Sequence, residues 1–205
     1  MKKIIIILVV FICGACASNK HKPTPDQNEL IGVVLKSHDN SLLLLGDEGL
    51  MTIPSETDYK VGEKLSIVYS GGIMESYPAQ LGSVDKIESK GMDETKAHLV
   101  LKILEKASDD IKDRGFDITG LTDIEKSALV YLMSQDGANS HIGSVDELIE
   151  QGVINKDGHF VNGIHYTIDI TDDTYEVKKY VTPQDTALTK GTFEKADGIY
   201  IITEN

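Results

Sequence analysis

Both cysteines of this chain lie within its first 16 residues, at Cys13 and Cys16, and this limits how the rest can be stabilised. Neither a disulfide framework nor a thiolate metal site can form in the later chain, because both need cysteines there. The fold must therefore be stabilised by apolar cores. Hydrophobic residues make up 40% of the 205 residues, which is enough for one or two small globular domains, although tryptophan is absent.

The first 15 residues have the layout of an export signal. Two lysines follow the first methionine, residues 4–12 are continuously apolar, and Gly14 and Ala15 precede Cys16. This end resembles the lipobox of bacterial lipoproteins, in which a peptidase cuts before a cysteine that carries lipid such as palmitate. The resemblance implies a signal peptide over residues 1–15 and lipidation of Cys16.

Cys13 departs from the lipobox pattern, because the family usually has leucine three residues before the lipidated cysteine. The alternatives are lipid on Cys13, or an ordinary secretory cut after Ala15 or Ala17. A retained transmembrane helix is disfavoured, since the apolar run is shorter than the about 20 residues that cross a bilayer. Residues 16–28 contain two prolines and no apolar periodicity, so we expect a flexible tether there.

The chain is acidic, with 20 basic and 33 acidic residues and a net charge of −13, which becomes −15 when the two signal lysines are removed. Such a charge repels nucleic-acid phosphates and anionic lipid headgroups. We therefore expect no nucleic-acid partner. The lipid would hold the protein at the cell membrane or the outer membrane, on the extracytoplasmic side.

Residues 29–90 show short apolar runs separated by turn residues, which is typical of β-strands. The runs cover residues 30–36, 41–45, 50–53, 65–69 and 84–88. Five strands in about sixty residues favour a small, closed or nearly closed all-β barrel of OB-like or SH3-like type, because an open sheet leaves two edges unprotected.

Residues 61–71 and the segment from Glu75 to Gln80, with its Ser-Tyr-Pro-Ala-Gln run, resemble an uncharacterised domain family of bacterial, often lipid-anchored, proteins. The resemblance implies an OB-like fold in the cell envelope and no particular activity. We expect Pro78 to leave the strand ladder and Tyr77 to cover the core. In the alternative, the segment forms the polar rim of a binding mouth, whose members are Glu75, Ser76, Tyr77 and Gln80.

After Gly91 the pattern becomes helical. A helix is predicted over residues 94–114, with Asp93 as its cap. Two capping boxes, Thr122 with Glu125 and Ser144 with Glu147, predict the starts of two further helices.

Strands follow at residues 164–170, 174–180, 191–194 and 199–203, and Asp197-Gly198 predicts a two-residue turn before the last of them. Helices followed by strands indicate an α+β domain with an antiparallel sheet over residues 93–205, with a domain boundary at residues 90–93.

Several segments of this second half resemble the globular heads of type IV pilins and pseudopilins. They are residues 145–154, 162–168, 173–177, 190–193 and 197–200, together with Pro183. Pilins assemble through a long apolar N-terminal helix, and this chain has a lipobox-like segment instead. The resemblance therefore implies a pilin-like module on a lipid tether that does not form filaments.

Few sequence features indicate a catalytic, metal or cofactor site. His159 and His165 can share one face of an extended strand, but no third ligand lies at a useful spacing, so we expect no metal and no cofactor. The sequence contains no glycine-rich phosphate loop and no Gly-x-Ser-x-Gly motif. These features favour a non-enzymatic envelope lipoprotein that binds a protein partner or supports an assembly. The alternative is a small-molecule-binding or hydrolytic envelope enzyme that uses the Glu75 to Gln80 rim or the His159/His165 face.

Overall fold

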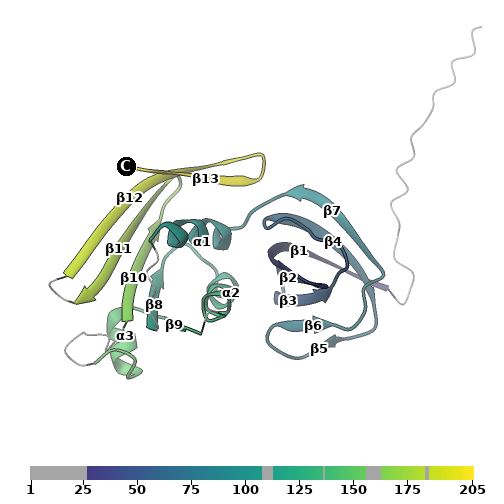
Figure 1. Cartoon of the computed structure of the whole chain (residues 1–205), viewed down its shortest axis with the longest axis horizontal. Coiled ribbons are helices and arrows are strands. Elements are labelled where there is room, and N and C mark those ends of the chain that lie inside the picture. Colours follow the sequence, from purple (N-terminus) through teal and green to yellow (C-terminus); the bar gives the residue numbers. More distant parts are fainter. Residues whose placement is uncertain (1–26, 108–112, 136, 156–162, 183–184) are drawn as a thin grey trace, which may run out of the picture.

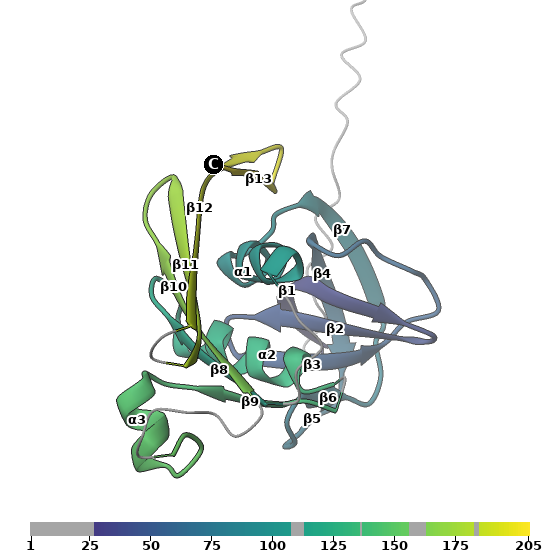
Figure 2. The same ribbon diagram turned by 60° about the vertical axis from the view of Figure 1, so that its left-hand side comes forward.

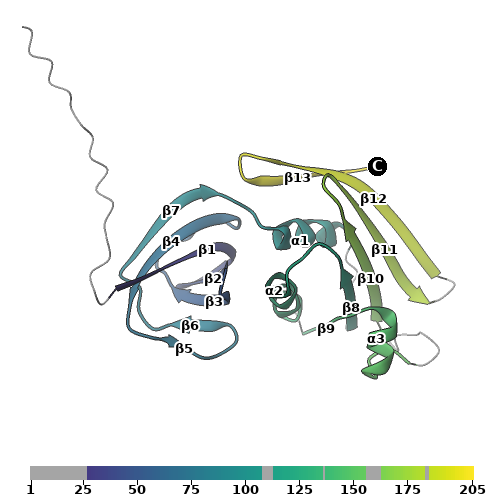
Figure 3. The ribbon, with the colours of Figure 1, turned by 180° about the vertical axis from the view of Figure 1, so that it is seen from behind.

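Two mixed β-sheets lie on either side of two helices, α1 (Lys96–Ala107) and α2 (Asp123–Met133), in the computed structural model of this chain (Figure 1). The structure describes residues 27–107, 113–135, 137–155, 163–182 and 185–205. Turning the molecule by 60° (Figure 2) or by 180° (Figure 3) leaves both helices between the sheets. None of the helices in these residues is long and apolar enough to cross a bilayer.

The first sheet contains the five predicted strands and two short ones that were not predicted. They are β1 (Gln27–His38), β2 (Ser41–Gly46), β3 (Gly49–Pro54), β4 (Glu63–Ser70), β5 (Ile73–Met74), β6 (Ala79–Leu81) and β7 (Lys86–Met92), in the spatial order β5-β6-β3-β2-β1-β4-β7. Because β1 already begins at Gln27, residues 27 and 28 belong to the sheet and not to the predicted tether.

The prediction of a closed barrel is wrong. Among the described residues, the end strands β5 and β7 do not pair with each other, so the sheet stays open. The reason lies in the connection between β4 and β7. After β4 the chain crosses to the opposite edge of the sheet, where β6 pairs in parallel with β3 and β5 pairs with β6. The chain then returns to place β7 beside β4, so the extra strands occupy the edge that barrel closure would need.

Four successive leucines in β2 show how this sheet serves two cores. Side chains alternate between the faces of a strand. Leu42 and Leu44 accordingly join a core on one face of the first sheet, with Ile53 and Ile67 among its other members. Leu43 and Leu45 join a second core that also contains residues of α1, α2 and the second sheet. Apolar packing thus runs continuously from the first sheet to the second. The domain boundary at residues 90–93 stays a prediction.

The second sheet has the spatial order β13-β12-β11-β10-β8-β9. Its strands are β8 (Asp113–Ile118), β9 (Asn139–Ile142), β10 (Gly163–Ile170), β11 (Thr174–Thr182), β12 (Asp185–Ala196) and β13 (Ile199–Glu204). The prediction of an antiparallel sheet is confirmed for β10 to β13 and wrong for β8 and β9, because β8 runs parallel to both β9 and β10. Helix α2 connects β8 to β9, and such a crossover is typical of parallel strands.

Three local predictions in this half, two helix starts and one turn, are confirmed. Both capping boxes are formed, at the starts of α2 and of α3 (Val145–Glu150). Asp197 and Gly198 have φ angles of 50° and 79°, as a two-residue hairpin turn requires. The first helix is shorter than predicted, because residues 113–118 form β8 instead of continuing it. The prediction that Asp93 caps this helix is wrong, because α1 begins at Lys96, and the Asp93 carboxylate pairs with Lys64 and Lys195 instead.

Candidate functional site

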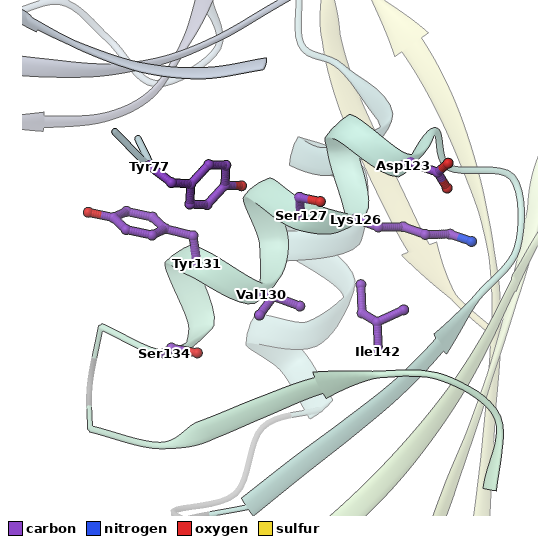
Figure 4. Close-up of a pocket in the computed structure, with 8 residues that line it drawn as sticks. All are labelled: Tyr77, Asp123, Lys126, Ser127, Val130, Tyr131, Ser134 and Ile142. Carbon is purple, nitrogen blue, oxygen red and sulfur yellow. The ribbon is translucent and has the colours of Figure 1, made fainter. Parts of the chain in front are cut away.

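A cleft of about 680 Å³ opens between the β5–β6 connection and the exposed side of α2 (Figure 4). Helix α2 is amphipathic, and Ala128 and Leu129 face the core. The residues on its other side recur at intervals of three and four, as one face of a helix does. Together with Tyr77 from the connection and Ile142 from β9, they line the cleft: Asp123, Lys126, Ser127, Val130, Tyr131 and Ser134.

Tyr77 and Tyr131 form the aromatic part of this cleft. Their rings meet edge to face, with centroids 5.8 Å apart and an interplanar angle of 84°. This is a preferred geometry for aromatic pairs and contributes about 1 kcal/mol. Tyr77 is 57% exposed, so the prediction that it covers the core is wrong. Its ring instead connects the first sheet to α2.

The hydroxyl groups of the two tyrosines point in different directions. The Tyr77 hydroxyl points toward Ser127 and the Tyr131 hydroxyl points away from it, as Figure 4 shows. Partial burial raises the pKa of Tyr77, and a hydrogen bond with Ser127 opposes this shift. The phenol is therefore neutral at physiological pH and offers both an apolar ring and a polar group.

The predicted polar rim is assembled only in part. Tyr77 lines the cleft, whereas Glu75, Ser76 and Gln80 are exposed and do not line it. Ser76 instead donates a hydrogen bond to the Pro78 carbonyl oxygen at 2.7 Å. Sequence reasoning did not find the α2 side of the site. The spacing of its polar and aromatic residues on α2 is visible in the sequence, but it does not reveal that Tyr77 lies opposite.

His165 is buried in β10, with 1% of its surface exposed. Its Nε2 atom lies 2.9 Å from the Gly143 carbonyl oxygen, which can only accept a hydrogen bond, so Nε2 carries the proton. The Nδ1 atom has no hydrogen-bond partner among the described residues. His159 lies outside the described residues, so the predicted shared face is not observed. In the described chain, no three histidine, aspartate or glutamate side chains are grouped to hold a metal ion.

His98 is a second buried histidine, 2% exposed, and it connects α1 to the first sheet. Its Nε2 atom lies 2.9 Å from the Val34 carbonyl oxygen, and its Nδ1 atom accepts the Thr95 backbone N–H at 3.0 Å. Both contacts require the neutral ring with the proton on Nε2. Burial lowers the pKa of His98, and the hydrogen bond to Val34 opposes this shift.

Because these two histidines are buried, we expect the free energy of unfolding to fall in mild acid. Burial lowers the pKa of both below the ordinary value of 6.5, so the unfolded chain takes up protons at a higher pH than the folded chain. Stability is therefore present above about pH 6.5 and is lost as the pH falls below it. Urea titrations from about pH 7 to about pH 5 should show this loss.

A double variant and a single control variant test this assignment. The free energy of unfolding should depend less on pH in the double variant His98→Gln, His165→Gln. It should keep its dependence on pH in His38→Gln, which changes an exposed histidine. An unchanged dependence on pH in the double variant would contradict the assignment.

A scan against models of protein families gives no match for this chain, and searches of curated proteins and of solved structures give none either. The function of the cleft therefore has to be inferred from its own geometry.

Proposed function

We propose that this protein is a bacterial cell-envelope lipoprotein, held on the extracytoplasmic side by lipid on Cys16, and that it binds a protein partner without catalysing a reaction. The observation that carries the binding part of this proposal is the cleft between Tyr77 and Tyr131. Tyr77 is exposed and Tyr131 is half-buried, and accessible tyrosines beside a cleft are typical of protein interfaces, because the ring contributes apolar area and the hydroxyl group can form hydrogen bonds at the solvated edge.

The lining of the cleft indicates what it would bind. Val130 and Ile142 offer apolar contact, and Ser127 and Ser134 offer hydroxyl groups. Asp123 and Lys126 carry opposite charges, so the charged part of the lining does not favour ligands of one sign. An apolar or aromatic side chain on a segment of a partner protein fits this chemistry. Asp123 is the one carboxylate in the lining and no histidine accompanies it, so the cleft contains neither a pair of carboxylates nor a histidine–carboxylate pair.

The anchor and the two family resemblances belong to the same proposal. An OB-like relationship for residues 29–90 is supported by the long strand β1, which pairs with both β2 and β4, and OB-folds are themselves only partly closed. A pilin-like relationship for residues 93–205 is supported by the antiparallel succession of β10 to β13 and its closing hairpin. The lipobox-like residues before Cys16 support the anchor.

Affinity capture with the chain from Cys16 onward tests the binding function. We expect this fragment to retain an envelope protein at micromolar concentration. Tyr77→Ala, at a tyrosine that lines the cleft and is 57% exposed, should weaken the complex roughly 5- to 30-fold, since an interface tyrosine of this kind contributes about 1–2 kcal/mol. Leu188→Ala is the matched control, because Leu188 is also apolar and exposed, at 55%, and does not line the cleft. Retention of no partner, or equal retention by both variants, would contradict the proposal.

A further inference from the structure

One edge of the second sheet is open beside the candidate cleft. Strand β9 is the last strand of that sheet, and no described strand pairs with its outer side. The Ile142 side chain of β9 lines the cleft and points toward α2 in Figure 4. The cleft therefore adjoins the open edge, because Ile142 belongs to both.

The direction of the β9 backbone groups follows from one hydrogen bond. The Gly143 N–H, directly after the strand, donates to the Phe116 carbonyl oxygen of β8 at 3.0 Å. Successive residues of a strand direct their N–H and C=O groups to opposite sides in the plane of the sheet. His141 therefore shares the direction of Gly143 and bonds to β8. Ser140 and Ile142 direct their N–H and C=O groups away from β8, where a further strand can pair with them.

The other edges of the two sheets are protected against such pairing. Strand β7 carries two lysines paired with Glu88, and charged side chains on an edge strand discourage pairing. On β13, the Tyr200 N–H and C=O are bonded by the side chains of Glu94 and Lys102. Strand β5 has two residues and is too short to pair over any length. Among the described strands at sheet edges, β9 lacks such protection, since it contains no lysine, arginine, aspartate or glutamate.

The charges around this edge indicate the partner. Helix α3 follows β9 directly and contains no basic residue, and its carboxylates Asp146, Glu147 and Glu150 are exposed. The whole chain has a net charge of −13. A second copy of the chain would bring two such acidic surfaces together and be repelled, whereas lysine or arginine on a different protein would be attracted.

We propose that an extended, basic segment of a partner protein adds to β9 as a further strand of the second sheet. Side chains alternate between the faces of a strand, so those of the added strand on the same face as Ile142 would enter the cleft. Recognition by strand addition has this form, in which backbone hydrogen bonds give affinity and pockets for alternate side chains give specificity. This inference rests on the proposed protein-binding function and names the kind of segment that is bound.

Hydrogen exchange followed by NMR tests the pairing within a single strand. The probe is a synthetic peptide chosen from a displayed library of random short peptides by selection on the chain from Cys16 onward, which contains every described residue. In the free protein, the Ser140 and Ile142 amides should exchange faster than the His141 amide, because of these three only His141 donates to β8. On adding the peptide, exchange at Ser140 and Ile142 should slow roughly tenfold or more, and exchange at His141 should slow less.

A proline variant tests the same edge through affinity. Ser140→Pro removes an outward N–H and leaves the bonds to β8 in place, since proline is tolerated where the N–H of an edge strand faces solvent. It should weaken peptide binding roughly tenfold or more. Ser140→Ala is the matched control. It keeps the N–H and removes a hydroxyl that has no hydrogen-bond partner among the described residues, so binding should stay within about twofold. The exchange measurement decides the question if Ser140→Pro does not fold.

The outcomes separate this inference from the proposed function. Binding that is weakened by Tyr77→Ala, without slower exchange at Ser140 and Ile142, would overturn the strand pairing alone. Slower exchange at these residues with no effect of Tyr77→Ala would contradict the cleft as the binding site. The selected peptides should be rich in lysine or arginine, and selection of no peptide or of acidic ones would overturn the inference. So would a free protein that sediments as a dimer with Ser140 and Ile142 already protected, because a second copy would then occupy the edge.

Discussion

Replacing Gly198 with alanine is expected to lower the free energy of unfolding by about 3 kcal/mol, as the sum of backbone strain and overpacking. Gly198 has a φ angle of 79°, in the left-handed region that disfavours a side chain. A Cβ atom at this position would also overlap the carbonyl group of Met92, which is backbone and cannot rotate away. The β12–β13 hairpin would have to move.

Moving this hairpin disturbs the contact between the two halves of the chain. The Gly198 carbonyl oxygen accepts the Glu94 backbone N–H at 2.7 Å, next to the start of α1. Lys195 of the same hairpin is paired with Asp93 at 2.7 Å. A shift large enough to accommodate a methyl group breaks these contacts together, so the loss should exceed that of an ordinary glycine substitution.

Gly152→Ala is the control that separates the cost of backbone strain from the cost of steric overlap. Gly152 has a nearly equal φ angle of 75°, and nothing lies within 4 Å of the position its Cβ would take. This control should therefore lose only about 1 kcal/mol, the cost of the backbone conformation. Urea unfolding of both variants measures the difference. Equal losses would mean that the hairpin is not in close contact with Met92.

The Asp197-Gly198 turn was predicted from the sequence, but its contact with Met92 was not. The preference of this dipeptide for positive φ angles is a local property, and so is a capping box such as Thr122 with Glu125. Both signals are complete within a few residues. The same holds for the short apolar runs, bounded by turn residues, that predicted β1 to β4.

The wrong prediction of a closed barrel and the missed half of the candidate site both concern contacts between distant parts of the chain. The pairing of β6 with β3 places β5 and β6 at the far edge of the first sheet and keeps that sheet open. No property of residues 79–81 by itself specifies which strand they pair with. The candidate site was missed for the same reason, since Tyr77 and Tyr131 meet only after the first sheet has packed against α2.

Glu94→Ala is expected to cost about 3 kcal/mol, because it removes one partner of a largely buried ion pair. Glu94 is 4% exposed, and its carboxylate lies 2.7 Å from the Lys102 ammonium. It also accepts the Tyr200 backbone N–H of β13 at 2.7 Å. The variant leaves that N–H without its acceptor and the Lys102 charge without its carboxylate, and an unsatisfied buried group is costlier than the lost bond.

The size of this loss measures how much the polar contacts of Tyr200 contribute to holding β13 against α1. Lys102 also donates to the Tyr200 carbonyl oxygen at 2.8 Å, so Glu94 and Lys102 together satisfy both backbone groups of Tyr200. Glu105→Ala is the matched control, since Glu105 is an exposed glutamate of α1, and it should change stability by less than about 0.5 kcal/mol. If both variants unfold at the same urea concentration, the polar contacts of Tyr200 contribute nothing, and apolar packing alone holds the hairpin to α1.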